Sequence, residues 1–89
     1  MNSVTTERFR KAYSNLPLHI REATKKTFQL WKKNPLHPGL RFKQVHKSKL
    51  VYSVRIGIGW RAVGIKEGDT MIWFWIGSHS EYDKLISRM

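Results

Sequence analysis

The chain has 89 residues, which is enough for one domain and no more. Its 17 lysines and arginines outnumber its 6 acidic residues, so the formal net charge is +11, and the lack of cysteine excludes disulfide and cysteine–zinc frameworks. Such self-repulsion favours an anionic partner: nucleic acid, an anionic membrane surface or an acidic protein. No apolar run approaches the roughly 20 residues of a membrane span, and no signal-peptide core follows Met1. We therefore expect a compact cytoplasmic domain with no membrane partner.

Two amphipathic helices are predicted in the first half of the chain. Apolar side chains recur at i, i+3, i+4 and i+7 over residues 7–16, and Thr6 is a suitable N-cap. Pro17 ends this helix, and the same period continues over residues 18–33 until Asn34-Pro35 stops it. The short connection at Pro17 predicts an antiparallel helical hairpin.

The rest of the chain has the pattern of strands followed by a short helix. The predicted strands cover residues 40–45, 50–58, 60–65 and 70–76. Residues 80–89 predict a short final helix capped by Ser80, and the residues before Thr6 can add an edge strand. The predicted fold class is therefore α+β. A two-helix hairpin packs on one face of an antiparallel sheet of about four strands, with a short C-terminal helix, in a single domain of residues 1–89.

Alternation over residues 50–58 assigns side chains to the two faces of the sheet. If Val54 and Ile56 point toward the helices, then Ser53 and Arg55 point away from them. We expect Val54, Ile56 and Trp73 to be buried. Ser53 and Arg55 should be at least partly exposed on the face that the helices leave free.

Further polar residues are expected to converge on this free face. Arg61 lies on the strand after Arg55, and Gly77 is predicted to turn the chain and expose His79, with Tyr82 one helical turn further on. These four residues are the candidate catalytic groups. The candidate RNA-binding residues are Lys43, His46, Lys47, Lys49 and Ser53.

These residue types suit cleavage of an RNA phosphodiester. Histidine can act as base or acid near neutrality, arginine offers a planar fork to phosphate oxygens, and tyrosine can donate a proton or stack on a base. Ordinary structural roles stay open, because Arg55 and His79 could be surface residues and Tyr82 could close the core. No metal-ligand spacing or phosphate-binding loop occurs, and the carboxylates are too few for a two-metal nuclease. We expect no metal and no cofactor.

The segments LVYSVRIGIGWRAVG and WIGSHSEYDKL, in this order of elements, resemble the RelE/ParE toxins of bacterial type II toxin–antitoxin systems. The resemblance implies an endoribonuclease that cuts mRNA on the ribosome by 2′-hydroxyl attack, without metal, and that an acidic antitoxin neutralises. By position it implies that Arg61 holds the scissile phosphate. Arg55 and His79 then occupy basic or catalytic positions, and Tyr82 supplies an aromatic hydroxyl. The acid and base roles stay unassigned.

Two other functions remain open from the sequence. The ParE branch of this family shares the fold but acts on gyrase and has no nuclease set, and the presence of both His79 and Tyr82 favours the nuclease branch. A non-catalytic nucleic-acid-binding module is the third hypothesis, since the charge of +11 is sufficient for it.

Overall fold

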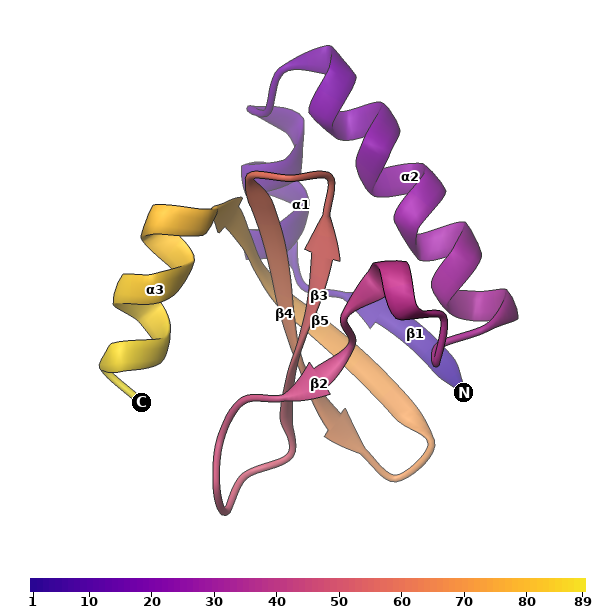
Figure 1. Cartoon of the computed structure of the whole chain (residues 1–89), viewed down its shortest axis with the longest axis vertical. Helices are drawn as coiled ribbons and strands as arrows, with labels where there is room; N and C mark the ends of the chain where they lie inside the picture. The colour runs from indigo at the N-terminus through magenta and orange to yellow at the C-terminus, as the bar shows by residue number, and fades with distance from the viewer.

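A five-stranded mixed sheet forms the centre of the fold, with the strand order β1-β5-β4-β3-β2 (Figure 1). The computed structural model describes all of residues 1–89. Its elements are β1 (Asn2–Thr5), α1 (Glu7–Ser14), α2 (Leu18–Lys33), the 3-10 helix η1 (Pro38–Leu40), β2 (Lys43–Gln44), β3 (Val51–Ile56), β4 (Trp60–Glu67), β5 (Thr70–Ser78) and α3 (His79–Ser87). None of the helices combines the length and apolar character that a membrane crossing requires.

The predicted α+β fold class is confirmed, with corrections to the sheet. The sheet has five strands, not about four, and it is mixed because β1 runs parallel to β5 at the open edge, where Asn2 pairs with Thr70. The strand predicted over residues 40–45 shrinks to Lys43–Gln44. Its first residue, Leu40, ends η1 instead; the His37 side chain caps this turn, and Arg41 follows it with a φ of 46°.

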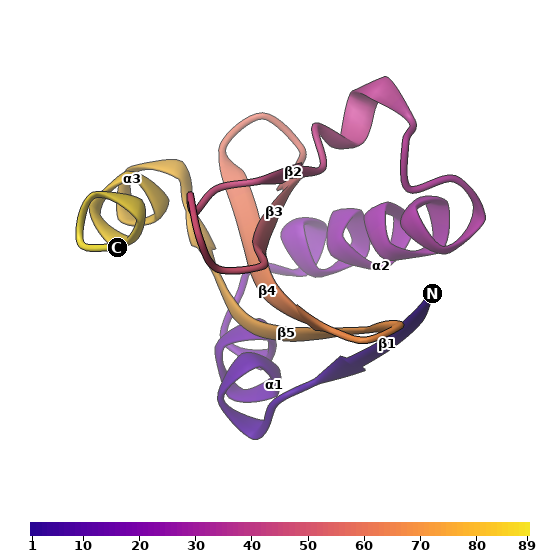
Figure 2. The ribbon, with the colours of Figure 1, turned by 90° about the horizontal axis from the view of Figure 1, so that it is seen from below.

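Helices α1 and α2 cover one face of the sheet, and α3 packs on the other. Phe28 and Trp31 of α2 contact Trp73 of β5 edge-on, with ring centroids 4.9 and 5.5 Å apart. Phe9 of α1 joins the same buried cluster. Tyr82 of α3 belongs to a second cluster on the opposite face. Figure 2 shows α2 and α3 on opposite sides of strands β3 and β4.

The predicted alternation of β3 is confirmed for the core and wrong for Ser53. Val54, Ile56 and Trp73 are fully buried, as expected. Ser53 points to the opposite face but is only 2% exposed, because α3 covers that part of the sheet with Tyr82. A serine enclosed in this way has no free surface to offer to RNA.

The last part of β5 also differs from the prediction. The strand continues through Gly77 to Ser78, and α3 begins at His79 with Ser78, not Ser80, as its N-cap. Gly77 does not turn the chain. Its lack of a side chain gives room to Trp75, because a Cβ at this position would lie 2.7 Å from the Trp75 ring.

Candidate nucleic-acid interface

Two arginines lie side by side on the sheet face that α1 and α2 leave uncovered. The antiparallel register of β3 and β4 places Arg55 directly opposite Arg61. Arg55 Nε donates to the carbonyl of Gly57 at 2.9 Å, and Arg61 Nη1 donates to the carbonyl of Trp60 at 2.8 Å. Both side chains are partly exposed, as the strand alternation predicts. The two guanidinium groups are thus held next to each other by their own backbone.

Arg61 is partly buried and lies close to other positive charges. Partial burial lowers the pKa of Arg61 most, and the neighbouring cations Arg55 and Arg41 lower it further, while Tyr82 and Asp83 act in the opposite direction. An arginine pKa starts so high that the group stays charged at neutral pH. The repulsion is therefore not relieved by loss of a proton, and a bound anion such as a phosphate would relieve it.

His79 lies next to this pair of arginines, at the first position of α3. Its backbone N–H donates to the carbonyl of Gly59 at 2.8 Å, which ties the start of α3 to the turn between β3 and β4. Its side chain is 52% exposed, and Nε2 lies 3.4 Å from Oδ1 of Asp83. His79 therefore lies at the rim of the sheet, at the same end as Arg55 and Arg61.

Tyr82 lies between the histidine and the arginine, and it is buried. The Tyr82 ring centroid is 6.2 Å from that of His79 and 5.9 Å from the guanidinium carbon of Arg61. Its hydroxyl donates to Ser53 Oγ at 3.0 Å, and the residue is only 8% exposed. In this conformation Tyr82 presents its ring, and not a free hydroxyl, to the candidate site. The predicted RNA contact of Ser53 is wrong for the same reason.

The other predicted RNA-binding residues lie on β2 and in the loop that follows it. Lys43 of β2 and Asp83 of α3 line opposite sides of one groove. Lys47 and Lys49 are exposed in the loop. His46 stabilises the conformation of this loop, because its Nδ1 accepts hydrogen bonds from the backbone N–H groups of Ser48 and Lys49.

The sequence prediction missed two charged residues of this region. Arg41 adds a third cation near Arg61. It was missed because the predicted strand over residues 40–45 gave it an extended conformation, whereas it lies at the end of the η1 turn. Asp83 brings a carboxylate to His79, and its spacing of four residues from His79 on a helix was the available signal. No group of three or more histidine, aspartate or glutamate side chains gathers as a possible metal site anywhere in the structure.

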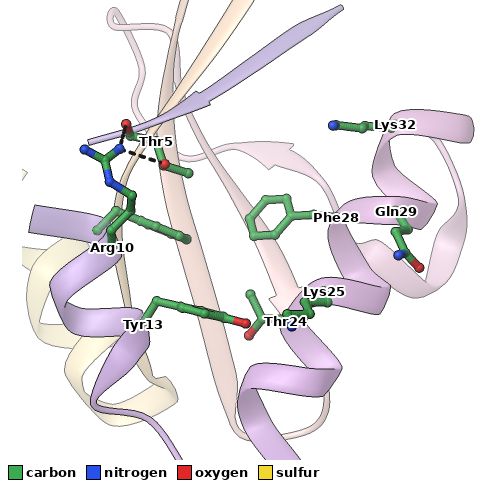
Figure 3. Close-up of a pocket in the computed structure, with 9 residues that line it drawn as sticks. Thr5, Arg10, Tyr13, Thr24, Lys25, Phe28, Gln29 and Lys32 are labelled. Carbon is green, nitrogen blue, oxygen red and sulfur yellow. Dashed lines mark hydrogen bonds between the residues drawn. The ribbon is translucent and has the colours of Figure 1, made fainter. Parts of the chain in front are cut away.

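A second concave feature lies between α1 and α2 (Figure 3). This interhelical cleft has a volume of about 380 Å³, and the aromatic rings of Phe9, Tyr13 and Phe28 form its apolar lining. The cations Arg10, Lys25 and Lys32 also line it, and no acidic residue does. Arg10 is held in place by hydrogen bonds to the backbone and side chain of Thr5. The cleft suits an apolar side chain on an acidic segment.

The sequence model of the ParE-like toxin domain matches residues 18–84, and the chain belongs to this family. It is thus a toxin of a toxin–antitoxin system. No protein of curated function matches the sequence significantly.

Solved structures of similar fold support this assignment. A chain of the RelB–RelE antitoxin–toxin complex from Methanococcus jannaschii superposes with a TM-score of 0.72 and 25% identity, over 91% of this chain and 96% of that one. A copper-bound mutant toxin from Helicobacter pylori gives a TM-score of 0.71 and 22% identity, over 91% and 97%. The isolated RelE toxin of E. coli gives 0.68 and 18%, over 98% and 96%. At these identities the last two show a shared fold alone.

Proposed function

We propose that this toxin is an endoribonuclease that cleaves mRNA on the ribosome. The observation that carries the proposal is the placement of Arg55, Arg61 and His79 at one end of the sheet face that α1 and α2 leave uncovered, beside the start of α3. Two guanidinium groups can stabilise charge on the phosphoryl oxygens, and an accessible imidazole can take or give a proton. The RelE fold of the chain is consistent with this activity.

In the proposed reaction the ribose 2′-hydroxyl attacks the adjacent phosphorus. The new O2′–P bond forms as the P–O5′ bond breaks, which leaves a 2′,3′-cyclic phosphate and a 5′-hydroxyl end. One group takes the proton of the 2′-hydroxyl, and the 5′-oxygen receives a proton in turn. Arg61 and Arg55 hold the phosphoryl oxygens, whose negative charge rises in the transition state. This route needs no metal ion and no cofactor.

Tyr82 has a defined place in this proposal. Its ring lies beside the Arg61 guanidinium and supports its orientation. Its hydroxyl becomes available as an acid only if the hydrogen bond to Ser53 opens. Lys43, Lys47 and Lys49 extend the cationic surface along the RNA, where they contribute salt-dependent affinity.

The proposed partner is an acidic antitoxin, in line with the antitoxin–toxin complex among the structures of similar fold. The net charge of +11 attracts such a protein over long distances. We propose that the antitoxin covers the cationic face and also inserts an apolar side chain into the interhelical cleft beside Lys25. Association of the toxin with the product of the adjacent gene should slow with added salt, and more steeply for the wild type than for Lys25→Gln. A salt-independent association rate would argue against electrostatic steering.

The activity is tested with purified ribosomes programmed with a defined mRNA. The wild-type toxin should cleave the message, and Arg61→Ala should slow single-turnover cleavage by about 10²–10³, as expected for the loss of one transition-state donor. Arg61→Lys should recover little, because a point charge does not replace the planar fork. Arg88→Ala removes an exposed arginine from the end of α3 and serves as the control with the same change of charge. Full activity in Arg61→Ala would remove this residue from the site.

A gyrase-directed toxin is the second candidate function. The match to the ParE-like toxin domain favours it, and so does the engagement of the Tyr82 hydroxyl with Ser53, which leaves one group fewer for chemistry. Inhibition of gyrase supercoiling without any cleavage of ribosome-bound mRNA would select this alternative.

A further inference from the structure

A groove runs between β2 and α3, on the sheet face that carries the arginine pair. Val45 and Ile86 form its apolar floor, and both are half-buried against the cluster that contains Tyr82. The part beside Tyr82 has a volume of about 470 Å³, and a second part continues from Val45 and Ile86 along the loop after β2. Figure 2 shows this loop bent toward α3. The β2–α3 groove is large enough to take a nucleobase.

The two walls of the β2–α3 groove carry opposite charges. Lys43 lines the β2 side, and Asp83 lines the α3 side. Ser87 also lines the α3 side, and because its hydroxyl donates to the carbonyl of Lys84 at 2.9 Å, its oxygen can still accept a hydrogen bond. Donors on one wall and acceptors on the other suit the edge of a nucleobase, which carries both kinds of group. The carboxylate also disfavours a phosphate in this place.

The register of the sheet places the groove one step from the arginine pair. Lys43 pairs with Ser53, and Arg55 pairs with Arg61, so the two pairs are two residues apart along β3, which is about 7 Å. Paired residues, and residues two apart on a strand, point to the same face, and Ser53 faces α3. One nucleotide of an extended RNA strand covers a comparable distance. A phosphate held by the arginines therefore leaves a neighbouring base within reach of the groove.

We propose that the β2–α3 groove binds the nucleobase next to the scissile phosphate. This inference rests on the proposed nuclease function and names a specificity subsite that this function leaves open. The apolar floor packs against the base, and Lys43 and Asp83 contact its edge, while Arg55 and Arg61 hold the phosphate. An acidic antitoxin segment suits the interhelical cleft better, because Asp83 lines the groove whereas no acidic residue lines the cleft.

The first test measures binding and needs no activity. The probe is an RNA dinucleotide with hydrogen in place of the attacking 2′-hydroxyl, compared with the two analogues that each lack one base. In ¹H–¹³C NMR spectra of the full chain, the methyl signals of Val45 and Ile86 should shift with the intact dinucleotide and with only one of the two analogues. Val4, exposed on the edge strand β1, is the control and should not shift. Unchanged Val45 and Ile86 signals, with shifted side-chain signals of Arg61, would overturn the inference.

The second test fills the groove and measures cleavage. Ser87→Phe places a ring in it, and Ser14→Phe is the matched control, because both serines are exposed, end their helices and donate to the carbonyl three residues earlier. Removal of the base beside the cut should slow single-turnover cleavage by the wild type about fivefold or more, as expected for the loss of one stacked base. Ser87→Phe should be slowed similarly on intact mRNA and should lose no further rate on the abasic one. Ser14→Phe should behave like the wild type.

The outcomes separate the subsite from the proposed function. Cleavage by Ser87→Phe at the wild-type rate, or an equal abasic loss in Ser87→Phe and the wild type, would overturn the subsite. Weaker binding of the antitoxin by Ser87→Phe with unchanged cleavage would also overturn it and would assign the groove to the antitoxin. Failure of the wild type to cleave any mRNA would remove both the proposed function and the subsite, whereas the other outcomes remove the subsite alone.

Discussion

The hydrogen bond between Tyr82 and Ser53 is expected to stabilise the packing of α3 on the sheet. Tyr82→Phe leaves Ser53 Oγ without a partner at a position that is only 2% exposed. An unsatisfied polar group in such a place costs about 1–3 kcal/mol of unfolding free energy. Ser53→Ala removes the acceptor of the same hydrogen bond and should cost about 0.5–1.5 kcal/mol, the usual net contribution of one hydrogen bond.

A double-mutant cycle isolates this interaction. The variant with both substitutions no longer carries the unsatisfied Ser53 hydroxyl and should be at least as stable as Tyr82→Phe alone, which gives a coupling energy of about 1 kcal/mol or more. In a domain of this size each kcal/mol corresponds to about 4–8 °C in Tm. Urea unfolding followed by circular dichroism gives the free energies. Tyr52→Phe is the matched control, because the Tyr52 ring stacks on Phe42 and its hydroxyl makes no hydrogen bond within the protein.

The same variants separate a structural from a catalytic role of Tyr82. If the hydroxyl acts only through Ser53, Tyr82→Phe should cleave mRNA within about threefold of the wild type at temperatures where both are folded. A loss of about 10² or more would instead mean that the hydroxyl leaves Ser53 and donates a proton during the reaction. Strict additivity of the two substitutions would refute the stabilising role of the hydrogen bond.

Three further predictions concern the stability of the domain. Gly77→Ala should cost about 1–3 kcal/mol in urea unfolding because the new Cβ would lie 2.7 Å from an indole ring, whereas Gly59→Ala meets open space and should be nearly neutral; equal effects would contradict this. The capping hydrogen bonds with Ser78 lower the pKa of Glu81 in the folded protein. The ionised Glu81 therefore stabilises the fold at pH values above its ordinary pKa, and this stabilisation is lost as the pH falls through the lowered pKa. Stability measured between about pH 5 and pH 3 should therefore fall less in Glu81→Gln than in the wild type, and parallel curves would disprove it. Added salt screens the repulsion between Arg55 and Arg61, which lie opposite each other, and so should raise the unfolding free energy of the wild type. Arg55→Gln should reduce this gain by about 0.2–1 kcal/mol, and an unchanged salt dependence would contradict the prediction.

The elements that the sequence predicted well are those whose limits are set locally. The bounds of α2, Leu18–Lys33, follow from an amphipathic period enclosed by prolines at both ends. The faces of β3 follow from strict alternation, which placed Val54 and Ile56 in the core. The arginine pair was predictable for the same reason, because antiparallel pairing across a short turn brings Arg55 beside Arg61.

The errors arise where tertiary contacts decide. The burial of Ser53 depends on α3 folding back over the sheet, which no local pattern in β3 reports. Gly77 was predicted to bend the chain, but its small size serves the packing of Trp75 within a continuing strand. The parallel pairing of β1 with β5 joins segments that are distant in the sequence. The pattern of the four residues of β1 does not indicate which strand they pair with.

The alternation of side chains along β5 changes phase within the strand, which the sequence did not show. The register between β4 and β5 shifts at Val63 and Gly64, so that Phe74 is left without a partner. After this bulge, Ile76 and not Trp75 shares the buried face of Trp73. Gly64 makes the bulge possible, because a Cβ there would lie 2.8 Å from the Trp73 ring.

The measurement that tests the account most directly is cleavage of a defined mRNA on purified ribosomes by wild-type toxin and by His79→Ala, with gyrase supercoiling assayed in parallel. The account predicts cleavage products that end in a 2′,3′-cyclic phosphate. It also predicts a loss of about 10²–10⁴ in single-turnover rate for His79→Ala, as for a missing general acid or base, and no effect on gyrase. Intact mRNA with wild-type toxin, together with inhibited supercoiling, would contradict the nuclease function and establish the gyrase-directed one.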